Sequence, residues 1–152
     1  MKKLCISVIL SIAIITGGRA ADISVNNSGQ LGTYTTITAA LAAAAPNDRV
    51  FVSPYGDYTE NLILFQNVTL ASAVSGTVFN VVGTMTINGA PNMDVRIIGA
   101  EFSGALTATT GGAGLNTKAE IYVVESSFSA ITGEDFVKMH LLYCTANPAM
   151  TI

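Results

Sequence analysis

The sequence has no tryptophan, a single histidine and two cysteines, and only 11% of its residues are charged. Cys5 lies in an N-terminal apolar segment, so Cys144 would be alone in a processed chain, which excludes an internal disulfide. His140 has no second histidine near it, so the sequence offers neither a zinc ligand set nor a nucleophile–base pair around it. Packing of the chain, and not cross-linking, must therefore supply the stability.

The first 20 residues have the pattern of a secretory signal peptide. Lys2 and Lys3 form a basic start, and residues 4–15 are apolar except for two serines. Gly18 and Ala20 place small residues at the two positions that a signal peptidase recognises, which predicts cleavage after Ala20. A membrane anchor is the alternative, but the apolar run is shorter than the roughly 20 residues that span a bilayer. We expect an exported protein, secreted, periplasmic or at the cell surface, with no membrane span after cleavage.

Basic residues are scarce in the remainder. Without the leader the chain keeps four Lys and Arg against ten Asp and Glu, a formal charge of about −6. This balance argues against nucleic acid as a partner and against an anionic membrane surface. A polyanionic polysaccharide would be repelled as well, unless calcium bridged it.

One phrase of alternating polar and apolar residues occurs four times. The alternation is typical of half-buried strands, and the copies start 27, 26 and 18 residues apart, as in stacked coils of a solenoid. The copies begin at Asn67, Asp94, Glu120 and Lys138.

Aligning the copies predicts which side chains stack. Two inward ladders are expected: Val68, Val95, Ile121, Met139, and Leu70, Ile97, Val123, Leu141. Two outward ladders follow from the same register: Asn67, Asp94, Glu120, Lys138, and Thr69, Arg96, Tyr122, His140. A helical repeat is the rival, but glycine and β-branched residues disfavour it. The pattern predicts an all-β fold, a single-stranded parallel β-helix of about four to five coils.

The mature chain is expected to form one domain with a distinct N-terminal part. Residues 21–48 are predicted to form a short strand and then a capping α-helix, with Thr35 or Thr36 as its N-cap. Ile37, Ala40, Leu41 and Ala44 share one face of that helix, which could cover the open end of the stack. Residues 49–152 are predicted to form the coils. No cap follows the last recognisable strand, which suggests either a truncated β-helix or self-association through an open C-terminal coil.

Three N-terminal motifs carry a family resemblance. They are Gly32–Ile37 (GTYTTI), Asn47–Val52 (NDRVFV) and Gly56–Leu62 (GDYTENL). In this order they resemble the N-terminal part of the pectate-lyase-like right-handed β-helix superfamily, and pectin methylesterases most closely. The resemblance implies a right-handed β-helix, but it does not extend to catalysis. Those enzymes work with two Asp, an Arg and Gln residues downstream, whereas the only later Gln here is Gln66, and Asp135-Phe136 is followed by Val-Lys instead of their motif.

The outward ladders hold the candidate site. Asp94, Glu120 and Arg96 could hold calcium or bracket a sugar, but a surface ladder in which Arg96 relieves the repulsion between the two carboxylates is the favoured interpretation. Calcium needs about six oxygen ligands and only two carboxylates are in view, so we expect no metal and no cofactor. Arg96, Tyr122 and His140 form a strip in which Tyr122 could offer an aromatic platform to a sugar ring. The candidate ligand-binding residues are Asp94, Arg96, Glu120, Tyr122 and His140, and no residue is predicted to be catalytic.

These observations favour an exported, non-catalytic β-helix that serves as a surface or carbohydrate-interaction module, with a polysaccharide or cell-surface glycan as partner. The alternative from another class is a truncated or divergent polysaccharide-active enzyme, similar to a pectin esterase or lyase. A third hypothesis is an adhesin or passenger fragment that assembles through its open end.

Overall fold

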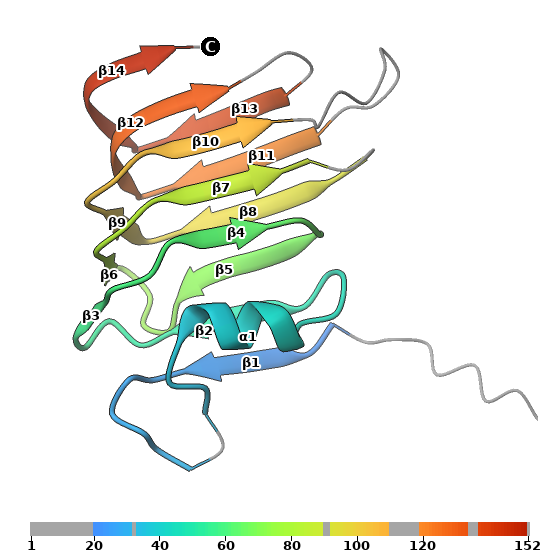
Figure 1. Ribbon diagram of the computed structural model, residues 1–152, viewed down its shortest axis with the longest axis vertical. Helices are drawn as coiled ribbons and strands as arrows, with labels where there is room; N and C mark the ends of the chain where they lie inside the picture. Colours follow the sequence, from blue (N-terminus) through green and yellow to red (C-terminus); the bar gives the residue numbers. More distant parts are fainter. Residues whose placement is uncertain (1–19, 32, 90–91, 110–118, 134–136, 152) are drawn as a thin grey trace, which may run out of the picture.

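The computed structural model describes residues 20–31, 33–89, 92–109, 119–133 and 137–151. Most of the predicted leader, the Thr- and Gly-rich segment 110–118 and the acidic pair Glu134-Asp135 lie outside these ranges. The described chain winds into a parallel β-solenoid of about four turns with one short helix, which confirms the predicted all-β parallel β-helix (Figure 1).

Two parallel sheets form the walls of the solenoid. Sheet A has six strands in the order β1-β2-β5-β8-β11-β13, namely β1 (Asp22–Val25), β2 (Arg49–Val52), β5 (Val68–Ser72), β8 (Asp94–Ile98), β11 (Ala119–Val124) and β13 (Val137–Leu142). Sheet B follows the order β3-β6-β9-β12-β10-β7-β4, with β14 beside β12. Its strands are β3 (Asp57–Tyr58), β4 (Leu62–Leu64), β6 (Phe79–Val81), β7 (Met85–Asn88), β9 (Ala100–Phe102), β10 (Leu106–Thr109), β12 (Ser127–Gly133) and β14 (Thr145–Thr151).

Each turn starts with a strand of sheet A and continues through sheet B, usually in two short strands. β8, β9 and β10 make one such turn, and β12 is long enough to pair with both β9 and β10. Figure 1 shows the strands of sheet A stacked behind those of sheet B.

Both predicted inward ladders are present. Val68, Val95, Ile121 and Met139 are in register, as are Leu70, Ile97, Val123 and Leu141. On β5, β8 and β11 these side chains are buried, whereas on β13, the last strand of the sheet, Met139 and Leu141 are only half-buried. Phe102 of β9 and Phe128 of β12 stack with ring centroids 4.8 Å apart, so the strands of sheet B contribute a ladder to the core as well. Identical apolar positions on neighbouring turns thus bury one another.

The predicted capping helix is α1 (Ile37–Ala43), which lies at the β1 end of the solenoid against β1, β2 and β4 (Figure 1). Thr36 is its N-cap and accepts a hydrogen bond from the Ala39 amide. The Glu60 carboxylate accepts further bonds from the amides of Ile37 and Thr38, both at 2.8 Å. The first full coil therefore holds the start of the helix.

The structure departs from the predicted elements at two places. The sequence Thr132-Gly133-Glu134-Asp135 has the composition of a turn, but Thr132 and Gly133 belong to β12, because they pair with β10. β14, which was not predicted, pairs with β12 through a register shift between Phe128 and Ala130, opposite the Asn147-Pro148 pair. Proline has no amide to donate to the ladder, so a shift at this point keeps the other amides paired.

Candidate functional site

The outer face of sheet A carries three ladders, because its strands are parallel, in register and alternate in side-chain direction. The acidic ladder is Asn67, Asp94, Glu120 and Lys138; the planar ladder is Thr69, Arg96, Tyr122 and His140; the apolar ladder is Phe51, Ala71, Ile98, Val124 and Leu142. The five candidate residues predicted from the sequence all fall in the first two ladders, so the structure brings them together on one surface.

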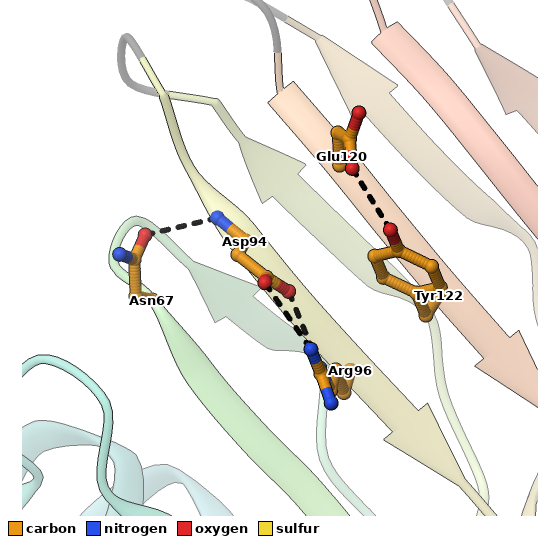
Figure 2. Close-up of polar contacts among 5 residues, drawn as sticks. All are labelled: Asn67, Asp94, Arg96, Glu120 and Tyr122. Carbon is orange, nitrogen blue, oxygen red and sulfur yellow. Dashed lines mark hydrogen bonds and ion pairs between the residues drawn. The ribbon is translucent and has the colours of Figure 1, made fainter.

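Asp94 and Arg96 form an ion pair along one strand (Figure 2). Arg96 Nε lies 3.4 Å from Asp94 Oδ1, and Arg96 Nη2 lies 3.4 Å from Oδ2. Asn67 Oδ1 accepts a hydrogen bond of 3.0 Å from the Asp94 amide, which ties β8 to the turn before β5. Both charged side chains are exposed, so the pair positions them more than it stabilises the fold.

Glu120 and Tyr122 form a second pair one turn away (Figure 2). The Tyr122 hydroxyl donates to Glu120 Oε2 at 2.8 Å, and Lys138 Nζ lies 3.5 Å from Oε1. The hydrogen bond from Tyr122, helped by the Lys138 charge, lowers the pKa of Glu120. The same hydrogen bond raises the pKa of Tyr122. At neutral pH this site therefore presents an ionised carboxylate and a neutral phenol.

Both faces of the Tyr122 ring are covered. The Arg96 guanidinium carbon lies 5.3 Å from the ring centroid, and the His140 ring stacks at 4.4 Å with an interplanar angle of 4°. Arg96 and His140 belong to the two strands that flank β11, so they occupy opposite faces of the ring. Tyr122 is thus not the open platform expected from the sequence; it presents its edge and hydroxyl group.

His140 is half-buried, and its Nε2 atom has no hydrogen-bond partner among the residues that the structure describes. What His140 contributes to the candidate site is its imidazole ring, which covers one face of the Tyr122 ring.

Among the described residues, this face has several open hollows. One of about 180 Å³ is lined by Asn67, Thr69, Asp94 and Arg96 among others, and one of about 320 Å³ adjoins Asp94 and Glu120. Another, about 380 Å³, lies at the Phe51 end of the apolar ladder and includes Tyr55, Asn26 and Gln30. Tyr55 is 75% exposed, so its ring is open to a ligand in a way that the Tyr122 ring is not.

The apolar ladder and the hollow at Phe51 were not predicted from the sequence. A signal was present, because three copies of the repeat end in two successive apolar residues: Ile97-Ile98, Val123-Val124 and Leu141-Leu142. With a period of two, the second of each pair must point outward. Ile98 and Val124 are half-buried and Leu142 is 56% exposed.

The candidate site offers few ligands for a metal ion. Within the described ranges no group of three or more His, Cys, Asp or Glu residues could hold a metal ion. Asp94 and Glu120 are each engaged by cationic or hydroxyl partners, and two carboxylates fall short of the oxygen ligands that calcium requires. Likewise, no helix in the described part of the chain has the length and apolarity to cross a membrane.

Comparison of the chain with models of protein families, with curated proteins and with solved structures gives no match. A function can therefore be inferred only from the residues of the protein itself, and the outer face of sheet A is the surface that offers binding groups.

Proposed function

We propose that this protein is an exported, non-catalytic β-solenoid that binds a neutral glycan chain along the outer face of sheet A. The observation that carries the proposal is the side-by-side arrangement of polar and apolar ladders across successive strands. A sugar ring has hydroxyl groups at its edge and C–H groups on its faces. The acidic and planar ladders supply hydrogen-bonding groups to the hydroxyls, and the apolar ladder supplies contacts for the C–H faces.

The charge of the chain supports a neutral ligand. The mature chain carries a formal charge of about −6, so a uronic-acid polymer would meet net repulsion. A neutral chain avoids this repulsion and can still use Asp94, Glu120 and Arg96 as hydrogen-bonding groups.

The state of the two carboxylates supports binding over turnover. A general acid must be protonated at working pH, and the lowered pKa of Glu120 opposes this. Asp94 is already occupied by its ion pair with Arg96. The alternative, a truncated or divergent polysaccharide esterase or lyase, predicts measurable hydrolysis or elimination by the purified protein.

We also propose that the solenoid belongs to the pectate-lyase-like right-handed superfamily that the N-terminal motifs resemble. The motif residues support this because they shape the first coil. Gly56 has φ of +101°, and a Cβ there would lie 2.5 Å from Asn27 Nδ2. Tyr58 is buried and donates its hydroxyl hydrogen to the Ser53 carbonyl, and Glu60 binds the start of α1. A family defined by fold need not share its chemistry.

A glycan-array screen of residues 21–152, followed by binding titrations of two matched variants, tests the proposal. Glu120→Ala removes an acceptor from the outer face of sheet A, whereas Glu101→Ala removes the same side chain from an exposed position on β9 in sheet B. We expect Glu120→Ala to weaken binding of a neutral glycan by about tenfold and Glu101→Ala to leave it unchanged. Equal effects of the two variants, or turnover of the glycan, would contradict the proposal.

A further inference from the structure

Asp48 is the only buried charged side chain in the part of the chain that the structure describes, with 5% of its surface exposed. Oδ1 accepts a hydrogen bond of 2.7 Å from the Ala21 backbone nitrogen, and Oδ2 accepts one of 2.8 Å from the Ala45 nitrogen. None of the ion pairs among the described residues involves Asp48. A carboxylate buried without a cation is costly, because amide hydrogen bonds do not neutralise its charge.

The residue that Asp48 binds is the first residue after the predicted cleavage site. Signal peptidase recognition of Gly18 and Ala20 would release Ala21 as the new N-terminus. Hydrolysis adds water across the bond between the Ala20 carbonyl carbon and the Ala21 nitrogen. The released amine then takes up a proton, since an α-amino group is mostly charged at neutral pH.

The new terminus would already be in position. The Ala21 carbonyl accepts a hydrogen bond of 2.9 Å from the Arg49 amide, and Asp22 is in register with Arg49 at the start of the β1–β2 pairing. Ala20 is exposed, so its removal leaves no hole in the core. The Ala21 nitrogen therefore stays within hydrogen-bond distance of Asp48 when it changes from an amide to an ammonium.

We infer that leader removal completes the fold, because the α-ammonium group of Ala21 becomes the counter-ion of buried Asp48. The ion pair between Ala21 and Asp48 joins the start of β1 to the loop after α1. Leader removal therefore stabilises the end of the solenoid that α1 covers. This inference depends on cleavage after Ala20 and is independent of glycan binding.

Three proteins with native Asp48 test the inference: one that begins at Ala21, one that retains Ala20, and one that begins at N-acetylated Ala21. Acetylation restores the amide and removes the charge. We expect the free Ala21 terminus to raise the folded-to-unfolded ratio about tenfold above the other two in urea unfolding. Equal stability of all three would overturn the inference.

Asp48→Asn in the first two proteins identifies the partner. We expect the advantage of the free Ala21 terminus to fall to less than about twofold when Asp48 is Asn. Asp57→Asn, at an exposed carboxylate on β3, is the matched control and should leave the advantage intact. An advantage that persists in Asp48→Asn would overturn the inference. So would N-terminal sequencing of the exported protein that finds a first residue other than Ala21.

Discussion

At the scale of single residues, Tyr122 organises the polar side of the face. Its hydroxyl group binds Glu120, while its ring lies between Arg96 and His140. The pKa of Glu120 is thus lowered chiefly by a neighbour two residues away on the same strand. This link can be tested without knowledge of the ligand.

Tyr122→Phe should raise the pKa of the Glu120 carboxyl group, because the hydrogen bond from the phenol is the largest cause of its lowering. A carboxyl group with a lowered pKa contributes stability above its unfolded pKa, and this contribution is lost as the pH falls through the folded pKa. The wild-type protein should therefore lose more stability than Tyr122→Phe on acidification. NMR titration of the Glu120 carboxyl carbon measures the shift directly. Tyr143→Phe, at a side chain that is 83% exposed, is the control, and an unchanged Glu120 titration in Tyr122→Phe would refute the link.

At the scale of secondary-structure elements, α1 is held at both ends by the first coil. Glu60 accepts hydrogen bonds from the first helical amides, and Gln66 Nε2 donates to the Ala44 carbonyl at 2.8 Å. A seven-residue helix has little stability of its own, so these contacts and its buried face keep it in place.

Glu60→Ala should lower the free energy of unfolding by about 2 kcal/mol, since it leaves two N-terminal helix amides without their carboxylate. Urea denaturation measures the loss. Glu101→Ala removes an exposed glutamate from β9 and should change the free energy by less than about 0.5 kcal/mol. Similar losses in both variants would show that the helix does not depend on Glu60.

The two neighbouring isoleucines of β8 separate core from surface. Ile97 is fully buried in an inward ladder, whereas Ile98 lies in the apolar ladder outside. Ile97→Ala should cost about 3 kcal/mol of unfolding free energy, and Ile98→Ala no more than about 1 kcal/mol. Equilibrium unfolding of both variants decides this, and the reverse order would mean that the register is shifted by one residue.

The periodic elements of this chain could be predicted from the sequence, and the irregular ones could not. Alternation and the spacing of the copies were enough to align Val95 with Ile121 and Arg96 with Tyr122. β14 was missed because Asn147-Pro148 interrupts its pattern, and the shifted pairing that accommodates it is a tertiary feature. The sequence also could not predict that both faces of the Tyr122 ring are covered. The strand register predicts which side chains are neighbours, but it does not predict how their planar groups are oriented.

At the scale of the whole molecule, the elongated shape and the net charge of the protein together determine which class of ligand we propose. The solenoid repeats its outer ladders from turn to turn, so a chain-like ligand can contact several strands at once. Residues 21–152 carry a net negative charge, which repels an acidic polymer that comes within the electrostatic screening length.

Binding of a neutral glycan should therefore depend little on ionic strength, with an affinity change below about twofold between low and physiological salt. Isothermal titration calorimetry at two salt concentrations measures this. A steep loss of affinity with salt would indicate an ionic ligand and would contradict the neutral-glycan assignment.

The most direct test of the proposed binding face is NMR mapping of amide shifts while a neutral oligosaccharide is titrated into a protein of residues 21–152. We expect the largest shifts to cluster on sheet A, at Arg96, Ile98, Tyr122 and Val124, and to extend toward Phe51. Amides of β6, β9 and β7 in sheet B should shift little. Shifts confined to sheet B, or spread evenly over both sheets, would contradict it.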